Sequence, residues 1–518
     1  MIIEPFSKDH LPLAETKNRF VFGVLFIYLV VEITGILFHP MWRDEIHFWS
    51  ISGASSSLKD LLHRKAWDGH PDLWYILVYA IRRLSDNPFS MQVMHIAIAG
   101  TTVFLILKYA PFSRGQRVLV IFGYFFMFEY SVISRNYSVG ILLITIMLIL
   151  HQRRARLLFV YALLFFLLAQ TNIFSLILTL AFLMTWAFEF SFSAPFRNSL
   201  LRQKTVLIIS IALVIIGIAY SLHTVMPPAS GPHVRGTDFS LSQLTLKELI
   251  RSTGTIWRAW IPIPEITLQF WNTNIVNSDL IKAILSLILI FAAGTLFVKH
   301  PVVLFLYIVG LIGVISFIFL LFFGYLRHHG HLFILLIACL WLKSYYQERT
   351  MPLRFPVLQQ FYGWMKRNFN MVFITLLTIH LFTGVFALTV QFLVPFSAGK
   401  ETAAYIRQGH LDRYLIAGDH DVSLETVSSY LDKPAFSFSR KVFSTYLDYD
   451  PSQRSNPDEA SILRMADSLV LINHDTLLLV MNYPLLTDRG KNLLKIKSFE
   501  RSIVENEVYY LYLLAPNN

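Results

Sequence analysis

Long apolar runs, separated by short polar or basic segments, dominate the first 394 residues of the chain. A helix needs about 20 apolar residues to cross about 30 Å of hydrocarbon, and many of these runs approach that length. No small-residue cleavage site follows the first run, so we expect it to be an anchor and not a cleaved signal. We predict about eleven membrane spans, at residues 19–39, 88–108, 117–134, 137–151, 157–171, 173–190, 205–223, 279–298, 301–323, 329–345 and 370–394.

After residue 395 the pattern changes to alternating short helices and strands, which is typical of a small α/β domain. The segments GKETAAYIRQG and SLETVSSYL have helical periodicity, whereas RYLIAGD, SLVLINH and VYYLYLL are apolar and strand-like. The predicted fold class is therefore an all-α polytopic membrane protein with a small C-terminal soluble α/β domain. We place the membrane domain at residues 1–395 and the soluble domain at residues 396–518.

Composition supports this division and excludes other classes of protein. The chain has 518 residues, of which 55% are hydrophobic and only 15% are charged, against about 25% charged in soluble globular proteins. These figures also exclude disordered and collagen-like chains. The single cysteine, Cys339, forms no internal disulfide, and nothing indicates a thiol-ligated metal.

The net charge of +11 would be typical of a nucleic-acid-binding protein if it were spread over the whole chain. From Pro395 onward, however, 13 Lys and Arg stand against 16 Asp and Glu, which leaves 31 and 17 in the first 394 residues. The basicity therefore belongs to the membrane part, where positive residues gather at the cytoplasmic ends of spans. We expect no nucleic-acid partner.

The same basic residues decide the sidedness of the chain. If His70–Arg83 were a span, most of the basic groups between later spans would lie outside, against the positive-inside rule. We therefore predict that His70–Arg83 is an interfacial helix, that the N-terminus is cytoplasmic, and that the C-terminal domain lies on the outer face. The groups that this choice brings inside are Lys108, Arg114, Arg117, Arg153, Arg154, Arg156, Arg197, Arg202, Lys204 and the Lys343–Arg367 group.

Two further outer segments follow from this topology, a first loop at 40–87 and a second at 224–278. The first loop contains adjacent carboxylates, Asp44 and Glu45, between interfacial aromatics. One reading is a solvated loop end in which Arg43 is the ion-pair partner. The other is a general base at the mouth of a membrane cavity, since acids beside hydrocarbon are costly unless they are paired or used.

The order of motifs points to a family. The Asp44–Glu45 pair, followed about 25 residues later by H-P-D-L-W-Y at 70–75, resembles the GT-C superfamily of integral membrane glycosyltransferases. The similarity is greatest to bacterial protein O-mannosyltransferases and lipid A aminoarabinose transferases, in which these motifs read D-E and H-P-P-L-Y-Y. Ser134–Tyr137 is similar to the family's R-P-Y element, with Asn136 in place of Pro. Tyr325–His328 is similar to its R-Y motif.

The resemblance implies an enzyme that transfers a sugar, with inversion, from a polyprenyl-phosphate-linked donor. The acceptor would be a glycan, lipid or protein on the outer face of a bacterial cytoplasmic membrane. It implies catalysis at Asp44 and Glu45, with Asp44 as general base, and no cofactor. Cationic side chains should hold the phosphate of the leaving group: Arg135, Arg327 and Arg258. We expect the substrate pocket and its surroundings to contain His70, Trp74, Tyr75, Tyr137, Glu129 and His328.

Two further hypotheses concern the same outer face. Segment 224–278 begins with a Pro/Gly/Ser stretch and continues as an amphipathic helix over 241–256, which similar enzymes use as a lid over the donor lipid. Histidines such as His47 and His70 raise the possibility of a divalent cation, although no spacing is diagnostic and we predict no metal.

The alternative functions are a transporter or flippase of lipid-linked sugars and a glycan ligase or polymerase. A transporter would predict inverted repeats and interrupted spans, which we do not find. A ligase would depend on the Arg327–His331 cluster, with His329 as its key residue.

Overall fold

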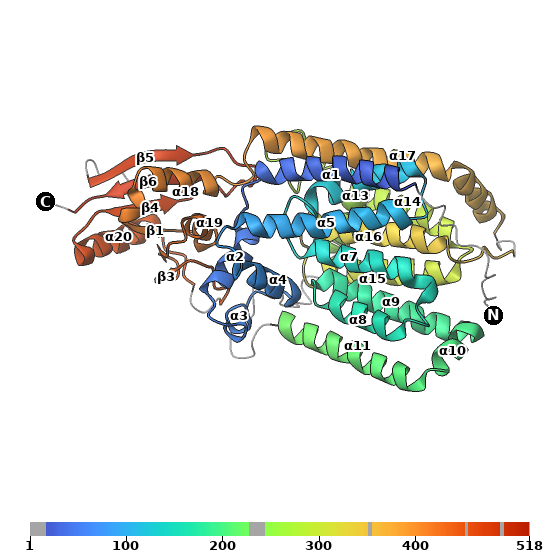
Figure 1. Ribbon diagram of the computed structural model, residues 1–518. Helices are drawn as coiled ribbons and strands as arrows, with labels where there is room; N and C mark the ends of the chain where they lie inside the picture. The colour runs from blue at the N-terminus through green and yellow to red at the C-terminus, as the bar shows by residue number, and fades with distance from the viewer. Residues whose placement is uncertain (1–16, 227–243, 351–354, 451–453, 487–491, 517–518) are drawn as a thin grey trace.

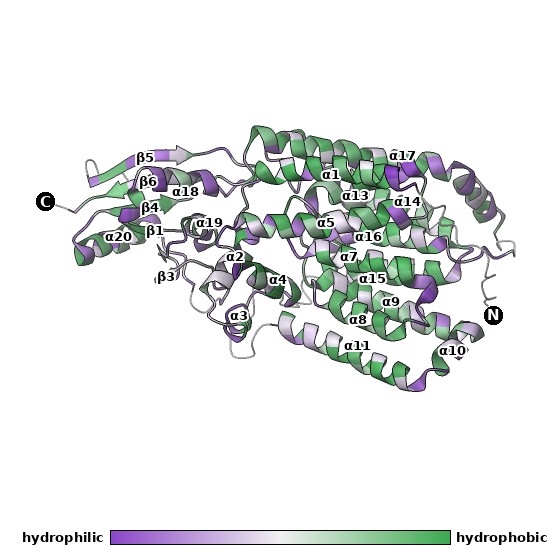
Figure 2. Cartoon of the chain, in the orientation of Figure 1, coloured by the Kyte–Doolittle hydropathy of each residue, from purple (hydrophilic) through white to green (hydrophobic). Residues whose placement is uncertain are grey.

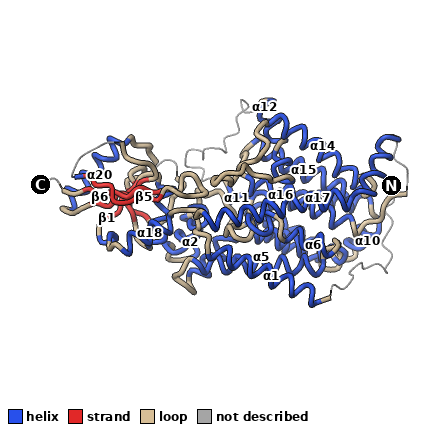
Figure 3. The backbone as a smooth tube through the Cα atoms, turned by 90° about the horizontal axis from the view of Figure 1, so that it is seen from above, coloured by secondary structure: helices blue, strands red, loops and turns tan. Residues whose placement is uncertain are grey.

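The computed structural model describes residues 17–226, 244–350, 355–450, 454–486 and 492–516. It is 66% helical, and the strands gather at one end of an elongated molecule (Figures 1 and 3). The prediction of a helical bundle followed by a small C-terminal α/β domain is therefore confirmed at this level. Most of the Pro/Gly/Ser stretch of the predicted lid falls within 227–243, outside the described residues.

Seven helices among the described residues are long and apolar enough, by length and composition, to cross a membrane. They form a bundle whose ribbons are largely apolar in Figure 2, and each overlaps one predicted span, which indicates a membrane protein. They are α1 (Asn18–Leu37), α5 (Phe89–Tyr109), α9 (Ile173–Phe192), α11 (Lys204–Val225), α14 (Asp279–Phe297), α15 (Pro301–Leu320) and α17 (Pro356–Leu393).

Three other predicted spans correspond to shorter or more polar helices. The segments at 137–151 and 157–171 form α7 (Tyr137–Leu150) and α8 (Leu158–Ala169), which are apolar but short. The segment at 329–345 forms α16 (Leu326–Lys343), which is buried from Leu326 to Leu342. Because α16 is buried on all sides, the charged and polar residues of its first turn, Arg327 and His328, also lie inside the protein.

The segment predicted to span at 117–134 is not one helix. It forms α6 (Arg114–Ile121) and a π-helical turn, η1 (Phe125–Glu129), and no helix follows before Tyr137. The hydroxyl of Tyr124 donates to Glu129 Oε2 at 2.5 Å, and a π-turn aligns residues five apart in this way. The non-helical stretch that follows carries Ser134 and Arg135. Hydropathy alone does not indicate this break.

Short helices lie at both ends of the bundle. At the end that faces the sheet are α2 (Arg43–Ala54), α3 (Leu58–Arg64) and α4 (Leu73–Arg82), whereas α10 (Ala194–Leu201) lies at the opposite end (Figure 1). With 10 residues, α4 reaches about 15 Å, which is too short to cross a membrane. The choice against a span at His70–Arg83 agrees with this length.

The predicted amphipathic helix at 241–256 is divided in two within its described part. The halves are α12 (Leu246–Thr253) and α13 (Thr255–Trp260). Gly254 lies between them, and a Cβ there would be 3.0 Å from the Cβ of Lys282 on α14. The glycine therefore permits a close approach between this segment and the bundle.

Within the described residues, the C-terminal part contains three α-helices, a short 3-10 helix (η4, Leu411–Arg413) and one six-stranded sheet in the order β3-β2-β1-β4-β6-β5. Alternate residues of β1 and β4 face two different cores, one beneath α18 and α19 and the other beneath α20. Helices thus cover both faces of a mixed sheet. The elements are α18 (Gly399–Gln408), β1 (Leu415–Gly418), α19 (Asp421–Leu431), β2 (Ala435–Ser437), β3 (Val442–Ser444), α20 (Glu459–Asn473), β4 (Leu477–Met481), β5 (Leu493–Phe499) and β6 (Tyr509–Leu514).

Four of the five predicted segments of this domain are confirmed, and the strand predicted at SLVLINH is wrong. Those residues form the last turns of α20, and the neighbouring strand is Leu477–Met481. Val470 is buried while Leu471 and Ile472 are exposed, as in a helix that presents one face to the core. Because all three residues are apolar, the sequence does not show which of them faces the core. Short apolar runs do not distinguish a strand from a helix by periodicity alone.

The sheet domain is held against the bundle through α2. Glu507, fully buried, accepts hydrogen bonds from the backbone N–H of Arg43 (3.3 Å), the hydroxyl of Ser397 (2.7 Å) and the hydroxyl of Tyr509 (3.0 Å). A second contact joins His47 on α2 to Glu425 on α19. The N-terminal turn of α2 is therefore fixed by a domain that follows it by more than 350 residues.

We expect Glu507→Ala to destabilise the protein. Each buried donor left without its acceptor costs about 1–3 kcal/mol, and this substitution strands several of them. The midpoint of thermal unfolding, followed by tryptophan fluorescence in detergent, should fall clearly. Glu505→Ala is the matched control, since Glu505 is exposed two residues away and its removal should leave the midpoint unchanged. An unchanged midpoint in Glu507→Ala would mean that the contact contributes nothing.

Candidate functional site

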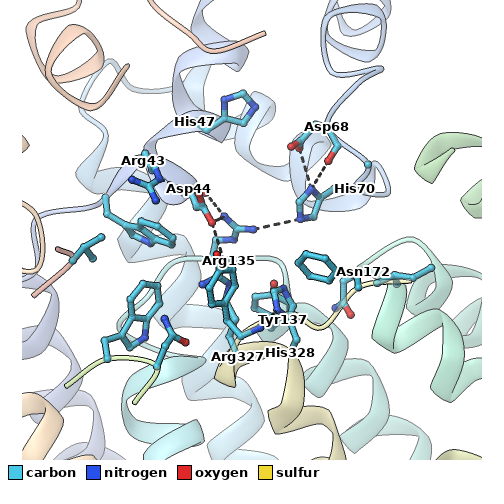
Figure 4. Close-up of a pocket in the computed structure, with 18 of the residues that line it drawn as sticks. Arg43, Asp44, His47, Asp68, His70, Arg135, Tyr137, Asn172, Arg327 and His328 are labelled. Carbon is cyan, nitrogen blue, oxygen red and sulfur yellow. Dashed lines mark hydrogen bonds and ion pairs between the residues drawn. The ribbon is translucent and has the colours of Figure 1, made fainter. Parts of the chain in front are cut away.

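A cavity of about 720 Å³ lies where the bundle meets the sheet domain. Its lining comes from segments far apart in the chain: the start of α2, the turn before α4, the starts of α7, α9 and α16, the segment 269–273, and residues of the sheet domain. Charged side chains gather on one side of it (Figure 4), and apolar side chains contribute to the rest of the lining. Figure 4 shows the charged side, where Asp44 lies between the side chains of Arg135 and Arg327.

Asp44 occupies the first turn of α2, where the helix dipole favours an acidic residue. Its Oδ2 lies 3.3 Å from Nη1 of Arg135 and 3.0 Å from Nη2 of Arg327. Arg135 Nη1 also donates to the backbone carbonyl of Asp44 at 2.5 Å. With 21% of its side chain exposed, the carboxylate of Asp44 faces the cavity.

The pKa of Asp44 lies below its ordinary value. Burial alone would raise this pKa, but the positive charges of Arg135 and Arg327, aided by Arg43 and His70, outweigh burial. The carboxylate is therefore ionised at neutral pH. A cation near a carboxylate favours its charged form in this way.

The two arginines are buried, and some of their N–H donors have no hydrogen-bond partner among the described residues. Arg135 and Arg327 are 4% and 5% exposed, yet Nε of Arg135 and both Nε and Nη1 of Arg327 have no hydrogen-bond partner among the described residues. Aromatic rings flank both guanidinium groups, Phe48 and Tyr137 at Arg135, and Trp42 and Trp271 at Arg327. Buried donors without acceptors beside a cavity are suited to an anionic ligand.

Glu45, predicted to be catalytic, does not line the cavity. It is fully buried, and its carboxylate accepts from the backbone N–H of Ser134 (2.6 Å) and of Trp42 (3.3 Å). Nε2 of His39 lies 2.8 Å away on the same carboxylate. Glu45 thus links the start of α2 to the stretch that carries Arg135, which positions the arginine beside Asp44.

His70 completes the charged side. Its Nδ1 lies 3.1 Å from Asp68 Oδ2, and its Nε2 lies 3.4 Å from Nη2 of Arg135. Tyr75 donates its hydroxyl to the same Asp68 carboxylate, and Trp74 is buried against Phe48. Of the predicted pocket residues, His70, Tyr137 and His328 therefore line the cavity, whereas Trp74 and Tyr75 support it from behind.

Two other predicted residues lie outside the lining. Arg258 donates to the backbone carbonyl of Asn272 at 2.6 Å, and Asn272 stands between it and the cavity as a lining residue. Glu129 accepts from Tyr124 and from the indole of Trp271 at 3.1 Å. Glu129 therefore holds a wall residue and does not pair with Arg135.

Several lining residues escaped prediction. Trp42 lies two residues before Asp44, and Asp68 lies two residues before His70. Their closeness to these predicted site residues could have indicated them. Trp271, Tyr449 and Asn506 were not foreseeable, because their sequence surroundings resemble ordinary loop positions. They reach the cavity only through the packing of segment 269–273 and the docking of the sheet domain.

The histidines of α16 do not converge on one point. His328 lines the cavity and accepts from the backbone N–H of Tyr325 at 2.8 Å. His329, fully buried, lies 2.8 Å from the carbonyl of Phe323 and is not part of the lining. Over the described ranges, no group of three or more His, Cys, Asp or Glu residues could hold a metal ion.

No protein-family model matches the chain, and no curated protein of similar sequence is found. The geometry of the cavity and the motifs of the sequence are therefore the grounds for inferring a function.

A pH dependence follows from the contact between α2 and the sheet domain. Burial would lower the pKa of His47, but the Glu425 carboxylate, 2.9 Å away, together with Asp68 and Asp44, raises it above the ordinary value. A raised folded-state pKa gives stabilisation that is complete below the unfolded pKa of about 6.5 and is lost as pH rises through the folded value.

We therefore expect the unfolding midpoint of His47→Gln to lie below that of the wild type at about pH 6, with the difference shrinking at alkaline pH. Thermal unfolding across a pH series measures this difference. Glu425→Gln should abolish the pH-dependent part, since it removes the charge that raises the pKa. A difference that stays constant from acid to alkaline pH would contradict the assignment.

Proposed function

We propose that the protein is an inverting glycosyltransferase of the GT-C type, which moves a sugar from a polyprenyl-phosphate-linked donor to an acceptor hydroxyl. The observation that carries the proposal is one carboxylate, exposed to a cavity, between two buried arginines that keep unused donors. A glycosyl transfer of this kind needs a base for the acceptor and positive charge for the departing phosphate. The motif resemblance and this cluster involve the same residues.

The two sides of the cavity suit the two halves of a lipid-linked donor. The charged side would hold the phosphate and the sugar. Ile173, Phe174, Val225 and Phe317 also line the cavity, at or near the ends of helices long enough to cross a membrane. An apolar chain entering beside these helices would leave its phosphate facing Arg135 and Arg327.

In the proposed reaction, Asp44 accepts the proton of the acceptor hydroxyl while that oxygen attacks the anomeric carbon. The bond from the anomeric carbon to the phosphate oxygen breaks, and the phosphate leaves with the electron pair. Arg135 and Arg327 stabilise the charge that develops on it. Because the phosphate competes with Asp44 for both guanidinium groups, donor binding would make Asp44 a stronger base.

The proposal includes a membrane topology and a location. We propose eleven spans, a cytoplasmic N-terminus, and a sheet domain on the outer face of a bacterial cytoplasmic membrane. The positive-inside rule supports this, since α10 and the start of α11 lie at the end of the bundle opposite the sheet domain (Figure 1). Arg197 lies in α10, Arg202 follows its last residue, and Lys204 begins α11. The cavity would then open toward the outer face.

We expect Asp44→Asn to lower the rate of sugar transfer by about 10²–10⁴-fold without weakening the binding of undecaprenyl phosphate. The substitution removes the base and also removes the negative charge that competes with a phosphate, so binding should be equal or tighter. Transfer from an undecaprenyl-phosphate sugar and binding of undecaprenyl phosphate, both in nanodiscs, measure the two effects. Normal transfer by Asp44→Asn would disprove the proposed base.

We expect Arg135→Ala and Arg327→Ala each to weaken the binding of undecaprenyl phosphate roughly 10- to 100-fold, since a hydrogen bond to a charged group contributes about 1.5–3 kcal/mol. Arg258→Ala is the matched control, because Arg258 lies outside the cavity lining and bonds to a backbone carbonyl. Equal losses in all three variants would indicate general destabilisation and would contradict a phosphate site at Arg135 and Arg327.

A further inference from the structure

A second cavity, of about 390 Å³, lies in the sheet domain. Residues that follow two neighbouring strands line it: Asp419 and His420 follow β1, and Tyr483 follows β4. Arg454 and Asn456 close another side. None of these residues belongs to the larger cavity or to the reaction proposed above.

The position of this cavity in the sheet is one where α/β domains bind ligands. β1 pairs in parallel with both β2 and β4, and the helices α19 and α20 pack on opposite faces of the sheet. The chain leaves β1 toward β2 on one side of this strand pair and leaves β4 toward β5 on the other side, so the connections diverge at the carboxyl ends of β1 and β4. Ligands of open α/β sheets bind in the crevice outside such a switch point.

The charged residues of the lining indicate which kind of ligand this cavity would bind. Arg454 and Asp421 neutralise each other through two hydrogen bonds, of 3.0 Å and 2.7 Å. Asp419 is 7% exposed and, among the described residues, accepts a hydrogen bond from the hydroxyl of Tyr483 at 3.1 Å, while Nε2 of His420 lies 3.9 Å from the same carboxylate. A carboxylate without a neutralising arginine disfavours an anion, and this one carboxylate falls short of the six or more oxygen ligands that Ca²⁺ takes.

The remaining groups are those that recognise a sugar. Tyr483 presents an aromatic ring, against which the ring of His420 packs edge-on with centroids 5.6 Å apart. Aromatic faces pack on apolar C–H surfaces, and a carboxylate with free lone pairs accepts hydrogen bonds from hydroxyl groups. We propose that this cavity binds a neutral saccharide, with Asp419 accepting from its hydroxyl groups and Tyr483 packing against its ring.

Two hydrogen bonds connect the wall of the larger cavity to residues that neighbour the lining of the second one. The backbone carbonyl of Asn506, which lines the larger cavity, accepts from the hydroxyl of Ser423 (3.1 Å) and from the amide of Asn482 (3.4 Å). Asn482 precedes Tyr483, and Ser423 lies two residues after Asp421. A saccharide held here would be linked to the wall of the larger cavity through these two contacts. The idea that this saccharide is part of a glycan acceptor rests on the proposed glycosyltransferase function, whereas the binding of a saccharide to the second cavity does not.

Saturation-transfer NMR on the full-length protein in nanodiscs tests the binding, with the methyl glycosides of glucose, galactose and mannose as probes. A ligand of this size should bind with a Kd on the order of 1 mM. We expect at least one glycoside to bind to the wild type. Asp419→Ala and Tyr483→Ala should lower its affinity at least about 10-fold, the loss of one strong contact.

Matched variants separate this inference from folding defects and from the proposed reaction. Asp475→Asn, exposed before the amino end of β4, should bind as the wild type does, and Asp44→Asn should bind the glycoside while losing transfer. The isosteric Asp419→Asn, with an unchanged unfolding midpoint, should still weaken binding.

Several results would overturn the saccharide site. They are the absence of binding by all three glycosides, binding that is unaffected in both Asp419→Ala and Tyr483→Ala, or binding that is lost in Asp44→Asn, which would locate the sugar in the larger cavity. Competition by inorganic phosphate for the same cavity would also contradict it.

Discussion

Two arginines and one aspartate, largely removed from water, create the electrostatic constraint on which the site depends. Buried charges are costly unless they are paired and hydrogen-bonded, and the carboxylate of Asp44 supplies one negative charge to two guanidinium groups. The excess positive charge is tolerated because aromatic rings flank both arginines. An anion that enters the cavity would neutralise the remaining positive charge of the two arginines.

The sheet domain contributes to this constraint by covering it. Glu507 binds the first turn of α2, Glu425 binds the next turn through His47, and Tyr449 and Asn506 form part of the cavity wall. The helix that presents Asp44 is therefore held from both sides, by the domain and by the buried carboxylate of Glu45. A preorganised carboxylate needs no rearrangement when a substrate binds.

Much of the architecture was predictable because hydrophobic periodicity and charge asymmetry are local properties of the chain. Seven predicted spans correspond to long apolar helices, and the charge-based prediction that His70–Arg83 is an interfacial helix and not a span agrees with the short helix α4. The failures occurred where tertiary contacts override the local pattern. The π-helical turn η1, which ends at Glu129, is fixed by hydrogen bonds from Tyr124 and Trp271 to Glu129. Whether the last residues of α20 form a helix or a strand depends on which of their apolar side chains face the sheet.

Six candidate residues could be named from sequence motifs alone, and all of them line one cavity: Asp44, Arg135, Arg327, His70, Tyr137 and His328. Their contacts and their neighbours in the cavity depend on how distant segments pack together. The tertiary structure separated Asp44 from Glu45, because successive residues of a helix point about 100° apart, and it removed Arg258 from the lining. It also brought in residues from segment 269–273 and from the sheet domain, since contacts across hundreds of residues arise from packing and leave no mark in local sequence.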